Sequence, residues 1–307
     1  MIIDSTKAPN DAKPLLQEVR SINVVSLFNG MGTLRQAFHN LGIKVNNYYS
    51  SEIKTYAIKL QQHHFPDVIQ VGDIRNWREW DIDWSSIDFI GSGSPCQDLS
   101  SSGKKAGING KNSSLFFTFV DIYNHCKSLN PNVKFLQENV GSASKLDVGI
   151  MSRELGVYPV RINSSLLTAQ LRDRYYWTNI KTKETMFDIV SDIPQPKDLK
   201  IKLQDIILSG KVNKEKSNAL IQRYIGACPK SEIALQKFLK NRVDFGSYCE
   251  IIENNKLRVF SKIEMCRLQG FPDNYCDILS EEEAGSLLGD GWTLPMIEHI
   301  LSFYAVQ

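Results

Sequence analysis

The sequence predicts an α/β fold in which a doubly wound, mostly parallel sheet carries a small insert. Short apolar runs alternate with segments of helical spacing between residues 21 and 180. The apolar runs end in loops rich in glycine and serine, and an open α/β sheet presents such loops to its ligands. The alternation stops at Lys181 and returns near Arg258. We therefore divide the 307 residues into an N-terminal arm (1–20), a main domain (21–180), an insert (181–256) and a C-terminal part that completes the main domain (257–307).

The composition is that of an ordinary globular protein. Hydrophobic residues make up 42% of the chain and charged residues 23%, which is typical of a domain with a full core. No apolar run approaches the length that spans a membrane, and the N-terminus carries no apolar signal segment. We therefore expect no membrane partner, a cytoplasmic location if the source is prokaryotic or viral, and a nuclear one if it is eukaryotic.

The cysteines and histidines give no metal signal. The six cysteines contain no CxxC pair, so neither a zinc knuckle nor a redox motif is indicated. Five of them are expected to be small buried hydrophobes, and Cys96 is the exception. His63 and His64 are adjacent on a predicted helix, where neighbouring side chains point apart. We expect no bound metal.

The main domain opens with a strand, a helix and a second strand. Residues 23–28 form an apolar, β-branched run that breaks at a glycine-rich turn. Thr33 is expected to cap a helix whose apolar positions follow helical spacing and which Gly42 ends. Residues 45–49 are the second strand. This βαβ unit predicts the parallel, doubly wound sheet.

The later elements continue the alternation. Helices are predicted over 55–64, 114–129 and 263–268, strands over 68–71, 87–91 and 133–137, and an antiparallel pair of strands over 158–163 and 175–179. One of these helices carries the aromatic side chains Phe116, Phe117, Phe119 and Tyr123. Two interpretations of this cluster stay open: packing in the core, and an interface for self-association into a homo-oligomer.

The insert has an excess of basic charge. It holds 14 lysines and arginines against 10 acidic residues, a net charge of +4, whereas the rest of the chain carries −2. A segment that faces nucleic-acid phosphates needs such a bias, and a solvated face would show it too.

The first strand-to-helix turn, Gly30-Met31-Gly32, is a candidate cofactor site. Its glycines let backbone amides approach a ligand at a helix N-terminus. Glu52 follows the second strand, where folds of this kind bind a ribose diol. Arg35 stands where a dinucleotide fingerprint would have its third glycine. On the residues alone, a cofactor site and a tight connection are equally good interpretations.

Three chemically distinct groups follow the ends of predicted strands. Pro95-Cys96 comes after a glycine- and serine-rich exit, Glu138 lies in the run Gln137-Glu138-Asn139-Val140, and Arg172 and Arg174 open a third strand. Strand ends of a parallel sheet converge on one edge. A soft nucleophile, a carboxylic acid and a guanidinium are the groups needed to attack, protonate and hold a pyrimidine ring.

From about Val24 to the C-terminus, the order of these motifs resembles that of the DNA cytosine-C5 methyltransferases. The runs Gly93–Ser100 and Arg174–Trp177 are most similar to the eukaryotic de novo class. The resemblance implies a Rossmann-like, S-adenosylmethionine-dependent methyltransferase fold with a small target-recognition insert. It also implies methyl transfer from S-adenosylmethionine to C5 of a flipped-out cytosine in double-stranded DNA, with S-adenosylhomocysteine as the second product.

The family's catalytic groups map onto four residues. Cys96 would attack C6 of the ring, and Glu138 would hydrogen-bond N3 and the exocyclic amine. Arg174 would bond O2 of the base, while Arg172 would help set Cys96 and the nearby backbone.

The resemblance also implies a set of cofactor contacts. Glu52 would bind the ribose hydroxyls and Asp73 the adenine amine. The remaining expected contacts are Phe28, Gly30, Gly32, Pro95, Asp290 and Trp292.

Two segments are expected to face the DNA. The loop after Cys96 carries Ser102, Lys104 and Lys105; we interpret it as a lid that closes over the flipped base and contacts phosphates, although a plain loop would have the same composition. The insert should recognise sequence. By the same resemblance, Arg258 and Glu264 hold that insert in place.

Three other functions are alternatives to DNA cytosine methylation. A catalytically inactive, DNA-binding or regulatory homologue would lack the nucleophile or the glutamate, and this chain keeps both. An RNA cytosine-C5 methyltransferase would carry a different run after its Pro-Cys than Gln97–Ser100. A folate-dependent enzyme acting on free pyrimidine nucleotides would not need the glycine turn or the basic insert.

Overall fold

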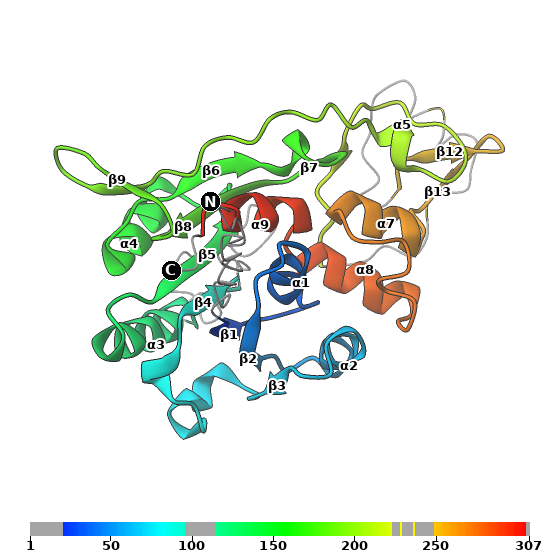
Figure 1. Cartoon of the computed structure of the whole chain (residues 1–307). Coiled ribbons are helices and arrows are strands. Elements are labelled where there is room, and N and C mark those ends of the chain that lie inside the picture. The colour runs from blue at the N-terminus through cyan, green and yellow to red at the C-terminus, as the bar shows by residue number, and fades with distance from the viewer. Residues whose placement is uncertain (1–20, 96–114, 223–227, 229–235, 237–248, 305–307) are drawn as a thin grey trace, which may run out of the picture.

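A seven-stranded sheet lies at the centre of the computed structural model, which describes residues 21–95, 115–222, 228, 236 and 249–304 (Figure 1). The strand order is β3-β2-β1-β4-β5-β8-β6, and β8 runs antiparallel to both of its neighbours. The strands are β1 (Ile22–Leu27), β2 (Val45–Ser51), β3 (Ile69–Gln70), β4 (Phe89–Ser92), β5 (Lys134–Val140), β6 (Val160–Asn163) and β8 (Asp173–Thr178). The predicted doubly wound sheet and its antiparallel pair of strands are confirmed.

Helices and short ribbons surround this sheet. The α-helices are α1 (Thr33–Asn40), α2 (Thr55–His64), α3 (Leu115–Leu129), α4 (Lys145–Leu155), α5 (Leu203–Ile206), α7 (Lys262–Gln269), α8 (Glu281–Asp290) and α9 (Leu294–Leu301). The 3₁₀ helices are η1 (Ile74–Glu79), η2 (Trp84–Ser86) and η3 (Ser164–Leu166). The small ribbons pair β9 (Thr182–Glu184) with β10 (Ile189–Ser191), β7 (Gln170–Leu171) with β11 (Ser217–Asn218), and β12 (Ile251–Glu253) with β13 (Lys256–Arg258).

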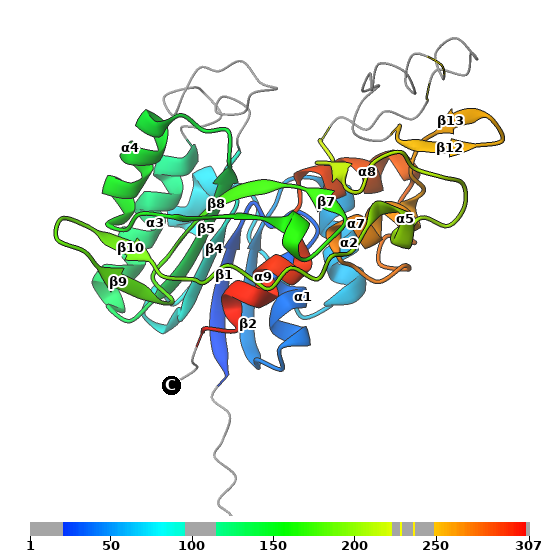
Figure 2. The same ribbon diagram turned by 90° about the horizontal axis from the view of Figure 1, so that it is seen from above.

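Both faces of the sheet are covered, because successive strand residues point to opposite sides. Val24 belongs to the cluster that includes α1, α7, α8 and α9, while its neighbour Val25 belongs to the cluster that includes α3 and α4. On β4, Phe89 belongs to the first of these clusters and Ile90 to the second. Figure 2 shows α3 and α4 on one side of the sheet and α1 and α9 on the other. The apolar strand runs therefore fill two cores.

The N-terminus of α1 differs from the prediction. Thr33 was expected to cap this helix, but the N-cap is Gly32, with φ +81° and no side-chain hydrogen bond. A left-handed backbone at the turn excludes most residues with a Cβ from the cap position, and this favours glycine. Thr33 is instead the first helical residue and is buried.

The aromatic cluster on α3 packs inside the protein. Phe116 and Phe119 are fully buried and Tyr123 nearly so. All three belong to the hydrophobic core on the side of the sheet covered by α3 and α4. The ring of Tyr123 lies 4.6 Å from that of Phe135 on β5. Core packing is therefore the confirmed interpretation of these three side chains.

The predicted N-terminal arm (1–20) lies outside the described residues.

Arg258 and Glu264, both expected to hold the insert in place, form an ion pair with each other. Both guanidinium Nη atoms of Arg258 donate to the carboxylate of Glu264 at 2.8 Å. Glu264 is the N3 residue of a capping box with Ser261 and also accepts from the backbone N–H of Leu208. A fully buried carboxylate thus joins α7 to the segment after α5.

Glu264→Gln is expected to destabilise the fold by about 3 kcal/mol, because it breaks a buried ion pair and leaves Arg258 without its main partner. Burial opposes ionisation of Glu264, but hydrogen bonds from Arg258, Ser261 and Leu208 outweigh it and hold the pKa below the ordinary value of 4.5. The folded protein therefore binds this proton less tightly than the unfolded chain. The stabilisation is complete above about pH 4.5 and is lost as the pH falls through the folded-state pKa.

Urea unfolding at pH 7 and at pH 3.5 measures both effects. The difference between wild type and Glu264→Gln should shrink at the lower pH. Glu283→Gln is the matched control, since Glu283 completes the capping box of α8 on an exposed surface. It should cost no more than about 1 kcal/mol. Equal losses in the two variants would contradict the role given to burial.

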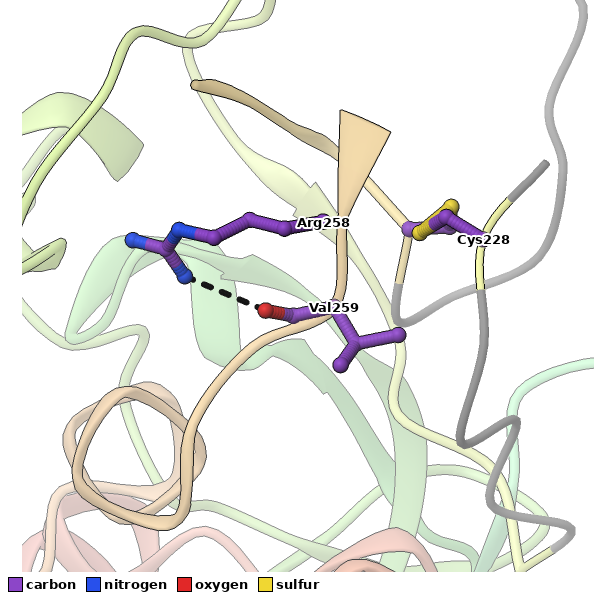
Figure 3. Close-up of a disulfide and its surroundings, with 4 residues drawn as sticks. Cys228, Arg258 and Val259 are labelled. Carbon is purple, nitrogen blue, oxygen red and sulfur yellow. Dashed lines mark hydrogen bonds between the residues drawn. A yellow bond between two sulfur atoms is a disulfide. The ribbon is translucent and has the colours of Figure 1, made fainter. Parts of the chain in front are cut away.

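The expectation for the cysteines is wrong for one pair. Cys126, Cys266 and Cys276 are buried and free, as predicted. Cys228 and Cys249 instead form a disulfide, with their Cα atoms 5.6 Å apart. Figure 3 shows this disulfide near the segment that carries Arg258 and Val259. A separation of 21 residues gives no sequence signal for a pair, because the pairing depends on how the insert folds back.

In the part of the chain that the structure describes, no group of three or more His, Cys, Asp or Glu side chains could hold a metal ion. Nor does any helix there combine the length and the apolar character needed to cross a membrane. His64 Nε2 donates a hydrogen bond to the carbonyl oxygen of Tyr275, 2.7 Å away, and the imidazole stacks on the Tyr275 ring.

Candidate active site

A cleft with a volume of about 1230 Å³ lies along the carboxyl ends of the parallel strands. This is the edge where an open α/β sheet binds ligands. Ten of the predicted site residues line it: Phe28, Gly30, Glu52, Asp73, Pro95, Glu138, Arg172, Arg174, Asp290 and Trp292. Gly32 is not among the lining residues. A Cβ added at this position would point toward Gln61 and Tyr275. Cys96, Ser102, Lys104 and Lys105 lie outside the described residues.

The segment that leads to Cys96 is anchored to β5. Ser94 Oγ accepts hydrogen bonds from Gln137 Nε2 at 2.9 Å and from Asn139 Nδ2 at 3.3 Å. These two donors flank Glu138 on the strand. The residue before Pro95 is therefore held against β5, the strand that carries Glu138.

Glu138 and Arg174 form an ion pair inside the cleft. Arg174 Nε lies 2.7 Å from Glu138 Oε1, and both side chains are largely buried. Val140 pairs with Arg174 across β5 and β8, so Glu138 and Arg174 are diagonal neighbours on one face of the sheet. Arg174 Nη1 also donates to the carbonyl oxygen of Asp173 at 2.8 Å. The register of two antiparallel strands thus brings acid and guanidinium together.

Arg172 is buried and ties three segments together. Its Nη1 donates to the carbonyl of Leu220 at 3.0 Å, and its Nη2 to those of Gly289 and Gly291 at 3.0 and 2.8 Å. Gly291 is the C-cap of α8, and a positive charge at the C-terminus of a helix interacts favourably with the helix dipole. Arg172 therefore joins the sheet, the insert and the loop after α8. No sequence pattern predicted these carbonyl contacts.

One end of the cleft is rich in carboxylates. Glu52 accepts hydrogen bonds from the backbone N–H of Gly30 at 2.8 Å and from those of Ile53 and Lys54 at 2.8 and 2.9 Å. These bonds hold the carboxylate beside the glycine turn, while Phe28 reaches φ +56° to make that turn. Oxygen atoms fixed in this way can accept from hydroxyl and amine groups of a small cofactor.

The other two carboxylates at this end have basic partners. Asp73 pairs with Arg75, whose hydrogen bonds hold the pKa of Asp73 below its usual value. Asp290 accepts from Lys54 Nζ at 2.8 Å. Burial opposes the charge on Lys54, but the Asp290 carboxylate outweighs it and raises the Lys54 pKa. The Lys54–Asp290 pair joins the start of α2 to the end of α8 at the rim of the cleft.

Residues from the insert also line the cleft, which the sequence analysis missed. They are Ala219, Leu220, Ile221 and Gln222. A side chain at Gly289 would overlap the backbone carbonyl of Ile221, so this glycine lets the insert pack directly on α8. No sequence pattern marks such a close approach, because the two segments are far apart along the chain.

Comparison with known proteins gives concordant results. The family model described as C-5 cytosine-specific DNA methylase matches residues 22–231. The type II methyltransferase M1.ScrFI of Lactococcus lactis subsp. cremoris is 28% identical over 305 residues, covering 90% of this chain and 76% of that protein. M.NlaX of Neisseria lactamica is 26% identical over 300 residues, covering 90% and 94%. The Dnmt2 methyltransferase structure of S. pombe superposes with a TM-score of 0.62 at 15% identity, covering 92% and 98%, and shows a shared fold.

Proposed function

The chain belongs to the C-5 cytosine-specific DNA methylase family, whose members are DNA cytosine-5 methyltransferases, and we propose the following roles for its residues. The methyl group comes from S-adenosylmethionine and goes to C5 of a cytosine that has left the DNA helix. The reaction passes through a bond between Cys96 and C6 of the ring. The observation that carries this proposal is the Glu138–Arg174 pair, which lies in one cleft with the carboxylate end around Glu52.

The chemistry needs a nucleophile because C5 of cytosine attacks poorly while the ring is aromatic. The thiolate of Cys96 forms a bond to C6, and the electron pair displaced from the C5–C6 double bond makes C5 nucleophilic. After C5 has gained the methyl group, its proton leaves to water or hydroxide. The electrons of the C5–H bond restore the double bond, and the C6–S bond breaks to release the thiolate of Cys96.

Glu138 and Arg174 act on the edge of the ring that lies opposite C6. Glu138 hydrogen-bonds N3 and the exocyclic amine, and it shares a proton with N3 as charge builds there. Arg174 donates to O2 of the base. Both side chains are largely buried, and hydrogen bonds to such groups are stronger than in solution. Arg172 is proposed to help set Cys96 and the nearby backbone.

The donor set at the carboxylate end fits S-adenosylmethionine. That cofactor supplies an electrophilic methyl group on a sulfonium, and it carries two ribose hydroxyls and an adenine amine. Glu52 would accept from the hydroxyls and Asp73 from the amine, and Gly30, Phe28 and Pro95 line the same cleft. Asp290, the last residue of α8, and Trp292, in the loop after that helix, also line the cleft.

A cytosine inside duplex DNA cannot reach this cleft, so the base must leave the stack. Ser102, Lys104 and Lys105 are proposed to contact the DNA as the loop closes over the flipped base. The insert over 181–256 is proposed to recognise sequence, and Ala219–Gln222 connect it to the cleft. The similarity to the de novo class and self-association both stay predictions.

The inactive-homologue and RNA alternatives are not favoured. The matching family model is described as a C-5 cytosine-specific DNA methylase, the relatives are type II methyltransferases, and an acid–guanidinium pair lies in the cleft. The deciding assay is transfer of a tritiated methyl group from S-adenosylmethionine to mixed-sequence duplex DNA, followed by separation of the nucleosides. Label in 5-methyldeoxycytidine is the expected result. Folded protein that labels tRNA, or nothing, would overturn the proposal.

Glu52→Gln is expected to raise the dissociation constant of S-adenosylmethionine by roughly 10- to 100-fold, the cost of losing a hydrogen bond to a charged acceptor. The amide keeps the size of the side chain, so the protein should stay folded. Calorimetric titration measures the affinity without turnover. The control is Glu79→Gln, an exposed carboxylate at the end of η1, which should bind as wild type does. An unchanged affinity in Glu52→Gln would remove Glu52 from the cofactor site.

A further inference from the structure

The indole N–H of Trp292 points at the carboxylate proposed to act on cytosine. Trp292 Nε1 donates to Glu138 Oε2 at 3.1 Å, although the two residues are 154 positions apart in sequence. Each residue is only 8% exposed. A buried hydrogen bond to a carboxylate holds its acceptor more firmly than a bond between neutral groups. Trp292 therefore contacts Glu138 as well as lining the carboxylate end of the cleft.

The ring of Trp292 has little freedom to turn away. It lies against the end of β4, where a Cβ added to Gly93 would sit 2.7 Å from the indole nitrogen. The adjacent backbone is also held: Arg172 Nη2 donates to the Gly291 carbonyl at 2.8 Å, and Thr293 Oγ1 donates to Gln269 Oε1 at 2.9 Å. The N–H is thus directed at Glu138 before any substrate binds.

The two oxygens of Glu138 have different partners. Arg174 Nε contacts Oε1 and Trp292 Nε1 contacts Oε2. In the proposed function Arg174 has to reach O2 of the base, so its guanidinium must share or leave Oε1. Trp292 has no such task and can stay on Oε2. One oxygen is then fixed while the other becomes available to the substrate.

We propose that Trp292 is a positioning residue of the methyl-transfer reaction. It fixes Oε2 of Glu138 so that Oε1 meets N3 of the cytosine when Arg174 turns to the base. The inference rests on the proposed function and assigns Trp292 a task in addition to its contact with the cofactor. It also explains the glycine at position 93, since any side chain there would displace the indole.

Trp292→Phe tests this because it keeps an aromatic ring and removes the donor. The turnover number should fall by roughly 10- to 100-fold, the usual effect of a misplaced catalytic group. The dissociation constant of S-adenosylmethionine should stay within about 3-fold, since the ring still covers the cofactor. Trp77→Phe is the matched control: Trp77 is buried, and its N–H has no hydrogen-bond partner among the described residues. It should turn over as wild type does.

A double-mutant cycle separates the two tasks. If Trp292 acts through Glu138, adding Trp292→Phe to Glu138→Ala should slow single-turnover methyl transfer by no more than about 2-fold. If it acts only on the cofactor, the two losses should multiply. Multiplied losses, or weaker cofactor binding that accounts for the whole loss, would overturn the proposal.

A spectroscopic measurement tests the hydrogen bond without turnover. The chain holds five tryptophans, so ¹⁵N-labelled protein should give five indole N–H signals, and Trp292→Phe identifies the one from Trp292. Glu138→Gln should move that signal and leave the Trp77 signal in place. A signal that does not move would contradict the proposal. Wild-type protein that transfers no methyl group would contradict the proposed function instead, and the spectrum would still report the contact.

Discussion

Replacement of Cys96 with alanine is expected to lower methyl transfer to DNA by at least about 10⁴-fold, which is of the order seen when a covalent nucleophile is removed. The reason is chemical: without a bond to C6, C5 of the cytosine keeps its aromatic electrons and does not attack a methyl group. Binding of S-adenosylmethionine should change little, since the carboxylate end of the cleft remains. Single-turnover transfer of tritiated methyl groups measures the loss.

Cys126→Ala is the control for this experiment. Cys126 is a buried, free cysteine on α3, away from the cleft, and its replacement should leave turnover near that of wild type. A duplex containing 5-fluorocytosine adds a second readout, because the carbon–fluorine bond prevents release of the adduct. Wild type and Cys126→Ala should become attached to this DNA, and Cys96→Ala should not. Full activity in Cys96→Ala would rule out the covalent route.

Glu138→Gln should lower turnover by about 10²- to 10⁴-fold, the range for a general acid that acts on the substrate. The amide cannot give a proton to N3 without an unfavourable charge of its own. It can still accept from Trp292 Nε1, so the geometry around the sheet edge should survive. Steady-state kinetics at saturating DNA and S-adenosylmethionine measures the loss, and thermal unfolding checks the fold.

Asp173→Asn is the matched control for Glu138→Gln. Asp173 also lines the cleft and accepts from Arg161 Nε at 2.8 Å, so this variant removes a negative charge from the same space. Its effect on turnover should be within about 5-fold, as expected for a partly exposed ion pair. Similar losses in both variants would mean that the charge of the cleft matters and that Glu138 has no specific task.

Much of the fold follows from local pattern. The helix over 55–64 and the strand before Pro95 were predicted because apolar spacing and glycine-rich exits are local properties of the chain. The predicted meeting of Glu138 and Arg174 at one edge of the sheet is seen in the cleft, where Glu138 comes from the end of β5 and Arg174 from the start of β8, which runs antiparallel to β5. Local pattern failed at Thr33, where the left-handed backbone of Gly32 replaced a side-chain cap.

The sequence by itself determined the α/β class, the strand ends that meet at the cleft and the residue types gathered there, because these depend on periodicity and on composition near each strand. Only the tertiary structure decided which groups touch. Arg172 meets three carbonyls, Trp292 meets Glu138, and Cys228 meets Cys249 across long stretches of chain. Such contacts depend on the packing of distant segments, which no local spacing encodes.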